Sequence, residues 1–184
     1  MKYEEKTINS HLIHQGKILN VRVDEVRLPD GGTSMREIVE HDGAVAIVAL
    51  NEHHELLLVK QFRKPIETTT IEIPAGKLEK NEAPLACAKR ELIEETGFDA
   101  KNISLALEIF PSPGFCNEKI YLYLASELVP KYLEKDEDEF MDLITVTPEK
   151  AALMIQQGLI NDSKTIIGIY HYLLHHHHPM ELQS

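Results

Sequence analysis

The sequence predicts an α+β fold, either one domain with a substantial core or a small domain joined to a short extension. The chain has 184 residues, too few for two full domains of ordinary size. Short apolar or alternating runs are separated by glycine and proline turns, as is typical of strands. Segments with helix-start signals and apolar stripes of helical period follow, so helices are expected as well.

The N-terminal part of the chain predicts a β-hairpin. Within residues 18–28 the valines change from one alternation to the other near Asp24, which indicates a strand with a bulge or bend there. The turn sequence PDGG follows, and residues 34–41 alternate as the returning strand. We expect residues 1–42 to form an N-terminal antiparallel β extension and residues 43–184 to form the main domain.

The main domain is expected to contain a central β-hairpin. Residues 44–50 (AVAIVAL) form a continuous apolar run of strand length, which indicates burial on both faces. After a short polar turn, residues 55–61 continue as its partner. Further strands are predicted just before Pro74 and at residues 103–110, 119–126 and 143–146.

Three helices are predicted in the main domain. The first starts at about Glu82 or Pro84 and is closed by Gly97 as a left-handed C-cap. The second begins at Thr147 as N-cap. The third covers residues 162–175, and its apolar stripe consists of Ile166, Ile169, Tyr170 and Leu173.

The composition restricts the classes of function. A net charge of -11 argues against a general nucleic-acid binder, because phosphate backbones are bound by clustered Lys and Arg. Excess carboxylate suits a divalent-cation site and does not exclude a small anionic substrate. The two cysteines, Cys87 and Cys116, indicate neither a disulfide framework nor a structural zinc. With a polar N-terminus and only short apolar runs, we expect a cytoplasmic protein without a membrane segment.

The residues expected to carry chemistry lie in the segment 76–98, GKLEKNEAPLACAKRELIEETGF. At 100° per residue, three carboxylates project from one side of its helix: Glu91, Glu94 and Glu95. They repel one another unless a cation neutralises them, and oxygen ligands favour Mg²⁺ or Mn²⁺. Arg90 could orient Glu94 or Glu82. The alternative is an ordinary solvated helix face, which composition alone would favour.

The spacing in this segment resembles the Nudix box, G-x5-E-x7-R-E-U-x-E-E-x-G-U with U a bulky apolar residue. Every defined position is matched, by Gly76, Glu82, Arg90, Glu91, Leu92, Glu94, Glu95, Gly97 and Phe98. The resemblance implies a Nudix fold, in which a mixed β-sheet lies between helices. It also implies that Glu91 and Glu95 bind Mg²⁺ with the backbone carbonyl of Ala75, that Glu94 supports them or binds through water, and that Glu82 is more peripheral.

Sequences outside the box are similar to the ADP-ribose pyrophosphatase subgroup of the Nudix family. They are REIVEH, VKQFRKP, EIPAGKLE, SPGF and DEDEF. This resemblance implies metal-dependent hydrolysis of ADP-ribose to AMP and ribose 5-phosphate, and a homodimer in which residues 1–42 cross to the partner. In the loop LEKDEDEFMD it implies Glu137 as general base and Glu139 as a further metal ligand or an alternative base.

The same resemblance assigns substrate contacts. Arg36 and Glu37 would reach the substrate from the hairpin, and Arg63 would pair with a phosphate. The residues around the terminal ribose would be Ser112, Pro113, Gly114 and Glu118. Each has an ordinary alternative, since the charged residues could be exposed strand positions and the Pro-Gly pair a tight turn.

Other substrates and a non-catalytic role are the rival interpretations. The subgroup often stacks adenine on aromatic residues of an N-terminal strand, whereas this chain has Ile18 and Leu19. The alternative substrates are GDP-mannose and ADP-glucose, because the Nudix hydrolases of these compounds share much of the scaffold. An ADP-ribose-binding sensor without catalysis is a different class, and the complete set of glutamates argues against it.

Overall fold

The computed structural model describes residues 2–131 and 140–176, and the chain forms two compact units. One unit contains the N-terminal residues up to 43 together with residues 110–119. The other contains residues 44–109 and the chain from residue 120 onward. Each unit is built around its own β structure, and each is described separately below.

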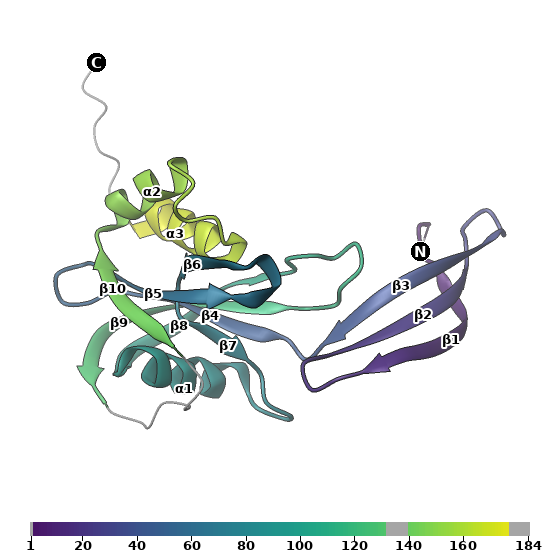
Figure 1. Ribbon diagram of the computed structural model, residues 1–184, viewed down its shortest axis with the longest axis horizontal. Coiled ribbons are helices and arrows are strands. Elements are labelled where there is room, and N and C mark those ends of the chain that lie inside the picture. The colour runs from purple at the N-terminus through teal and green to yellow at the C-terminus, as the bar shows by residue number, and fades with distance from the viewer. Residues whose placement is uncertain (1, 132–139, 177–184) are drawn as a thin grey trace, which may run out of the picture. The chain divides into compact units, whose positions relative to one another are not determined.

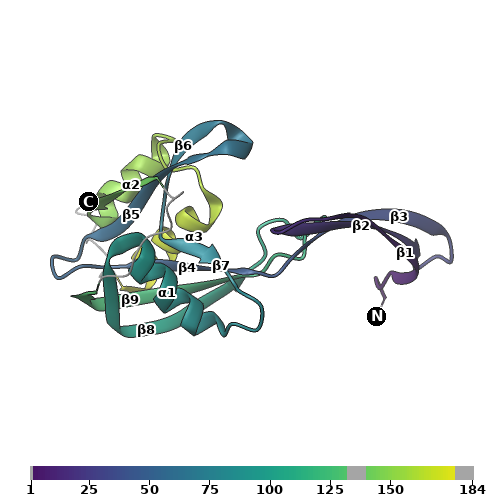
Figure 2. The same ribbon diagram turned by 60° about the horizontal axis from the view of Figure 1, so that its bottom comes forward.

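The first unit contains a three-stranded antiparallel sheet of β1 (Lys6–Gln15), β2 (Leu19–Arg27) and β3 (Thr33–His41), with β2 in the middle (Figure 1). Figure 2 shows the same sheet nearly edge-on. The predicted hairpin corresponds to β2 and β3. The sequence did not indicate β1, because all ten residues of this strand are exposed and no apolar alternation marks a buried face.

The predicted bulge near Asp24 is wrong. The β2–β3 register runs without interruption from Leu19 opposite His41 to Arg27 opposite Thr33, and the register shifts of this sheet lie in β1. The side chain of Asp24 is buried, and its carboxylate accepts hydrogen bonds from the hydroxyls of Ser10 and Thr7 and from Arg22. Asp24 is thus a buried polar residue in an unbroken strand, and in the sequence it interrupts the apolar pattern as a bulge would.

The second unit contains two sheets. The four-stranded sheet has the order β7-β4-β9-β8 and is mixed, since β4 and β9 run parallel and the other neighbours antiparallel. Its strands are β4 (Ala44–Ala49), β7 (Ala75–Lys77), β8 (Phe98–Ile109) and β9 (Ile120–Pro130). The antiparallel sheet β10-β5-β6 consists of β5 (Leu56–Arg63), β6 (Thr68–Glu72) and β10 (Met141–Val146), with a short 3-10 turn η1 (Lys64–Ile66) between β5 and β6.

The predicted central hairpin is wrong, because β4 and β5 belong to different sheets. Only one isolated bridge, Leu50 opposite Leu56, joins them. Both edges of β4 are already occupied, by β7 on one side and β9 on the other. The polar turn between them therefore moves the chain from one sheet to the next, and β5 pairs with β6 and β10.

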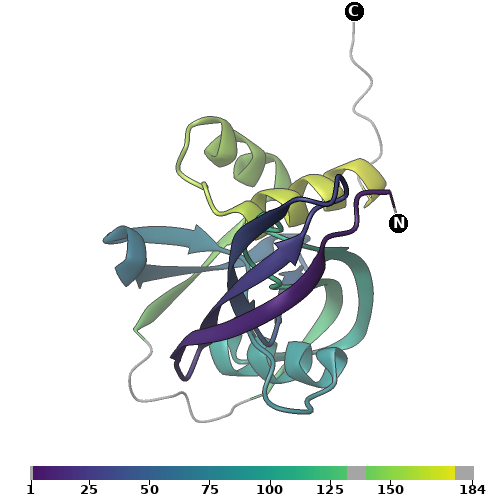
Figure 3. The ribbon, with the colours of Figure 1, turned by 90° about the vertical axis from the view of Figure 1, so that its right-hand side faces the viewer.

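Helices cover both faces of the mixed sheet, as Figures 1 and 3 show. The helices are α1 (Pro84–Thr96), α2 (Pro148–Gln156) and α3 (Ser163–His176). Alternate residues of β4, together with Leu50 directly after it, contribute to two cores. Val45, Ile47 and Ala49 share a cluster with Leu92 and other α1 residues. Ala46, Val48 and Leu50 share another with Ile169 of α3 and Ala151 of α2.

The predicted burial of β4 on both faces is therefore confirmed, and so is the mixed sheet between helices. In α3, Ile169 is buried, and Ile166 and Leu173 pack against the same core. The prediction for Tyr170 is wrong, because this residue is exposed and Tyr172 packs on the core instead. Among the described residues, no helix is both long and apolar enough to cross a membrane.

Helix α3 approaches the sheet closely at Gly168. A Cβ at this position would lie 2.8 Å from Val48 Cγ2, 3.1 Å from Leu122 Cδ1 and 3.2 Å from Ile73 Cδ1. All three neighbours are fully buried and have little room to move.

We expect Gly168→Ala to destabilise the protein by about 1 to 2 kcal/mol, because overpacking outweighs the higher helix propensity of alanine. Urea unfolding of the variant measures this change. Gly114→Ala is the control, since nothing lies within 4 Å of a Cβ there. Equal stability of the two variants would contradict the close-approach argument.

Candidate active site

Helix α1 carries the side chains predicted to do the chemistry. It begins at Pro84 after Ala83 in extended conformation, as expected because proline at N1 loses no helical hydrogen bond. It ends at Thr96 because Gly97 adopts a left-handed conformation, with φ of 77°, and its N–H donates to the carbonyl of Ile93 at 2.8 Å. The predicted start at Pro84 and the predicted cap are confirmed.

Arg90 binds three carboxylates of this segment at once. Its Nε and Nη2 donate to the two carboxylate oxygens of Glu82, each at 3.0 Å. Its Nη1 donates to Glu91 Oε1 at 2.8 Å and to Glu94 Oε2 at 2.9 Å. The sequence left open whether Arg90 pairs with Glu94 or with Glu82, and the structure has both pairs. The hydrogen bonds from Arg90 lower the pKa of Glu82 to about 2, so Glu82 is ionised at neutral pH.

Gly76 lies directly against the carboxylate of Glu91. A Cβ built on Gly76 would be 1.8 Å from Glu91 Cδ and 1.9 Å from Glu91 Oε1, which is far inside van der Waals contact. Because glycine has no Cβ, the carboxylate can lie on the backbone of β7. Strand β7 and helix α1 therefore approach each other closely at Glu91, the first predicted metal ligand.

Glu95, one helical turn after Glu91, is bonded to the same strand. Its side chain is buried, and its Oε2 accepts a hydrogen bond from the backbone N–H of Ala75 at 3.0 Å. The structure thus brings together the three groups predicted to hold a metal: the carboxylates of Glu91 and Glu95 and the backbone of Ala75.

This donor set fits a hard divalent cation. Carboxylate and carbonyl oxygens are the ligands that such ions prefer, and Gly76 leaves room for one of the carboxylates. Within residues 2–131 and 140–176, no three His, Cys, Asp or Glu side chains already form a group that could hold a metal ion. Glu91 and Glu94 are instead bonded to the same nitrogen of Arg90.

Arg63, the predicted phosphate ligand, lies at the end of β5 and is paired with Glu72 of β6. Its Nε donates to Glu72 Oε1 at 2.8 Å and its Nη2 to Glu72 Oε2 at 2.7 Å. The remaining nitrogen, Nη1, bonds to none of the described residues. The Glu72 hydrogen bonds raise the pKa of Arg63, and the charges of Glu95, a candidate metal ligand, and of Asp162 add to this effect.

Glu72 was not among the predicted site residues, although its side chain is 2% exposed. Its signal in the sequence was a single charged residue between two apolar residues, Ile71 and Ile73, at the end of a strand. A buried carboxylate at such a place requires partners. In addition to Arg63, these are the hydroxyl of Thr70 at 2.6 Å and the ammonium group of Lys164.

Glu72 should make the stability of the protein sensitive to acid. Burial opposes its ionisation, but the hydrogen bonds from Arg63 and the charge of Lys164 outweigh burial and lower the pKa of Glu72 to about 2. The folded pKa lies below the ordinary value of 4.5, so the stabilisation is present above pH 4.5 and is lost as the pH falls toward 2. This shift corresponds to about 3 kcal/mol at neutral pH.

Urea unfolding of the wild type and of Glu72→Gln at several pH values between 7 and 2.5 tests this expectation. The wild type should be the more stable protein at pH 7, and the difference should shrink as the pH falls. A difference that does not depend on pH would show that the ionisation of Glu72 does not stabilise the fold.

Within the N-terminal unit, four of the predicted substrate residues line one cavity of about 410 Å³: Arg36, Glu37, Pro113 and Gly114. Phe115, which was not predicted, lines it as well and is more than half exposed. The loop is attached to β3, because Val39 N–H donates to the carbonyl of Phe115 at 2.8 Å. The charged group of Arg36 is also held locally, by two hydrogen bonds to Glu5.

The other two predicted residues of this loop, Ser112 and Glu118, do not line that cavity. The carbonyl of Ser112 closes a tight turn by accepting from Phe115 N–H at 3.2 Å and from Cys116 N–H at 2.9 Å. Glu118 lies 3.9 Å from Nδ1 of His41. Here the ordinary turn interpretation describes the backbone at Ser112.

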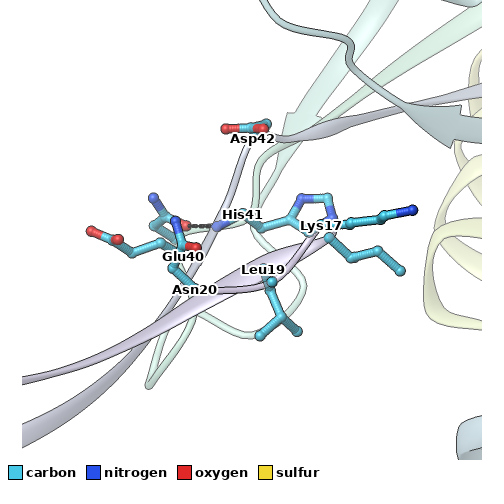
Figure 4. A pocket seen from close by; sticks show the side chains of 9 residues that line it. Lys17, Leu19, Asn20, Glu40, His41 and Asp42 are labelled. Atoms are coloured by element: carbon cyan, nitrogen blue, oxygen red, sulfur yellow. Dashed lines mark hydrogen bonds between the residues drawn. The ribbon is translucent and has the colours of Figure 1, made fainter. Parts of the chain in front are cut away.

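A second cavity of the same unit, of about 270 Å³, is formed where β1 turns into β2 and β3 ends (Figure 4). Ile18 and Leu19, the residues in place of the expected aromatic side chains, line it and are partly exposed. Most of its other lining residues are polar: Lys17, Asn20, Glu40, His41, Asp42 and Asn117. The side-chain oxygen of Asn117 accepts a hydrogen bond from the backbone N–H of His41 at 2.7 Å.

Glu137 and Glu139, the candidates for general base and additional metal ligand, lie outside the described residues. Their assigned roles stay predictions.

Comparison with known proteins decides the family. A model of the NUDIX domain matches residues 40–166, and a model of the nucleoside diphosphate sugar hydrolase N-terminal domain matches residues 5–39. The chain belongs to the Nudix family. The interpretation of residues 76–98 as a Nudix box is therefore confirmed.

Relatives of this Nudix chain match it over almost its whole length. An ADP-ribose pyrophosphatase of Bacillus subtilis (strain 168) is 45% identical over 173 residues, 93% of this chain and 94% of that protein. A methanol dehydrogenase activator of Bacillus methanolicus is 45% identical over 174 residues, 94% of each chain. A solved ADP compounds hydrolase has the same fold, with a TM-score of 0.82 and 20% identity, covering 93% of this chain and 95% of that one.

Proposed function

We propose that this chain is a Mg²⁺-dependent hydrolase that cleaves the diphosphate bond of ADP-ribose to give AMP and ribose 5-phosphate. The observation that carries the proposal is the placement of Glu91 against Gly76 and of Glu95 against the backbone of Ala75, which is a carboxylate pair held on strand β7. Two relatives named for ADP-ribose or ADP compounds support the choice of substrate.

Mg²⁺, or Mn²⁺ in its place, would offset charge on the diphosphate and help to generate the attacking hydroxide. Glu91, Glu95 and the carbonyl of Ala75 would hold it. Because Glu91 is bonded to Arg90, a bound cation would compete with Arg90 for this carboxylate, and Arg90 would remain fixed by Glu82 and Glu94. Glu137 is proposed to accept the proton of the attacking water, and Glu139 is proposed as a further metal ligand or as the alternative base.

Arg63 is proposed to bind a phosphate through Nη1, since its Nε and Nη2 are occupied by Glu72. Arg36, Glu37, Pro113 and Gly114 are proposed to contact the nucleoside or ribose, with Ser112 and Glu118 at the border of this region. The cavity supports the contacts of the four residues that line it and gives no such support to Ser112 or Glu118.

A cytoplasmic homodimer that exchanges its N-terminal sheets is also proposed. The exposed edge strand β1 supports it, because the unpaired backbone N–H and C=O groups of a strand edge can pair with a strand of another chain. The free cysteines Cys87 and Cys116 are consistent with a reducing compartment. Light scattering of the purified protein tests the dimer, and a monomeric mass would reject it.

A substrate panel tests the proposed function. ADP-ribose, ADP-glucose, GDP-mannose, NADH and diadenosine polyphosphates are incubated with Mg²⁺, Mn²⁺ or EDTA, and the products are identified. Preferred metal-dependent release of AMP and ribose 5-phosphate from ADP-ribose is expected. If another compound is preferred, that compound takes the place of ADP-ribose as the proposed substrate. Binding of ADP-ribose without cleavage would favour the sensor interpretation.

Arg63→Ala is expected to raise the KM for ADP-ribose about tenfold and to lower kcat less, because a charged contact made to the phosphate before and during the reaction is lost. Steady-state kinetics measures both constants. Lys60→Ala, at an exposed position of the same strand, is the matched control. An unchanged KM in Arg63→Ala would remove Arg63 from the phosphate site.

A further inference from the structure

The carboxylate of Glu72 is shared by two cations that come from different elements of the main unit. Arg63 of β5 binds both of its oxygens, and Lys164 of α3 binds Oε2. Thr70 donates to Oε1. A carboxylate has about four acceptor positions, and four donors fill them here. The orientation of Glu72, and with it the side-on orientation of the Arg63 guanidinium group, is therefore fixed from three directions.

The side chain of Lys164 is held in place by its own contacts. Its side chain is 12% exposed, and its ammonium group also pairs with Asp162 Oδ2 at 3.1 Å. Asp162 in turn binds the first turn of α3, by accepting from the N–H of Thr165 at 3.0 Å and from its hydroxyl at 2.6 Å. The ammonium group of Lys164 is thus bound to the carboxylates of Glu72 and Asp162 and is not directed at a ligand.

The start of α3 also holds the strand end that follows Glu72. The N–H of Ile73 donates to the hydroxyl of Thr165 at 3.0 Å. Two residues later, the N–H of Ala75 donates to Glu95. Residues 72–75 therefore have three connections. Glu72 pairs with Arg63, Ile73 is bonded to the start of α3, and Ala75 is bonded to the candidate metal ligand Glu95.

We propose that Lys164 is a positioning residue, which acts through Glu72 to hold Arg63 with Nη1 directed at the phosphate of the substrate. This inference rests on the proposed function of Arg63. Without Lys164, a buried carboxylate would have one cation in place of two, and Arg63 would be drawn toward it and away from the phosphate. Removal of the Lys164 ammonium group should then lower the affinity for substrate, although Lys164 does not contact the substrate itself.

The test uses the full-length protein and the variants Lys164→Met, Lys164→Arg and Lys131→Met. Lys131 is the matched control, because it forms a 2.9 Å ion pair with Asp99 and has no contact with Glu72. We expect Lys164→Met to raise the KM for ADP-ribose about tenfold with a smaller fall in kcat. Lys164→Arg should restore most of the affinity, and Lys131→Met should resemble the wild type.

A double-variant cycle separates positioning from a general structural role. In the Arg63→Ala background, Lys164→Met should raise KM by less than about twofold, because the group that it positions is already absent. Equal effects of Lys164→Met in both backgrounds, or no difference from Lys131→Met, would overturn the inference. Thermal unfolding confirms that each variant compared is folded.

Titration with inorganic pyrophosphate and Mg²⁺ separates this inference from the proposed function. If the wild type binds pyrophosphate but hydrolyses no nucleotide, the proposed function fails, and a tenfold weaker binding by Lys164→Met would still support positioning. If the wild type hydrolyses ADP-ribose and Lys164→Met binds pyrophosphate as tightly, only the inference fails. A wild type that neither binds nor hydrolyses would reject both.

Discussion

Glu95→Gln is expected to lower kcat for ADP-ribose by about 10³-fold or more, because a proposed direct ligand of the catalytic cation loses its charge. The fold should remain, since glutamine has an oxygen that can accept the hydrogen bond that Ala75 N–H now donates to Glu95. Initial rates at saturating substrate and Mg²⁺ measure the loss, and circular dichroism with thermal unfolding measures the fold.

Glu52→Gln is the matched control for this variant. It removes the same charge from a side chain that is 87% exposed in the turn between β4 and β5. Its activity should equal that of the wild type. If Glu95→Gln kept wild-type activity, the carboxylate of Glu95 would not be a metal ligand.

The candidate site was predictable where its geometry is local. Glu91, Glu94 and Glu95 lie on one side of α1 because helical spacing alone places them there, and Gly97 ends the helix by its own conformational freedom. The sequence also indicated that β4 is buried on both faces, because an unbroken apolar run has no solvent-facing positions.

The remaining features depend on contacts between distant parts of the chain. β1 has no apolar pattern because none of its residues is buried, and its place follows only from pairing with β2. Lys164 and Glu72 are 92 residues apart, and nothing in the sequence of either segment indicates the other. The path from β4 into another sheet likewise follows from β9 occupying its edge, which is decided by residues 120–130.

Gly76→Ala is expected to lower turnover of ADP-ribose by at least about 10²-fold with little change in stability. The added methyl group would occupy the space of the Glu91 carboxylate, at 1.8 Å from its carbon. Glu91 lies at the end of a flexible side chain, so it can rotate away at small cost to the fold. It would then no longer lie at the proposed cation position, and Mg²⁺ affinity should fall together with kcat.

The comparison with Gly168→Ala makes this prediction specific, because the same chemical change meets different neighbours. At Gly168 the methyl group meets immobile core side chains, so stability should fall while the activity of the folded protein persists. At Gly76 it meets one movable carboxylate, so activity should fall while stability persists. Mg²⁺ titration of activity and urea unfolding, applied to both variants, measure the two effects. If Gly76→Ala lost stability and kept its Mg²⁺ dependence, Gly76 would serve packing, and Glu91 would not need its present position for catalysis.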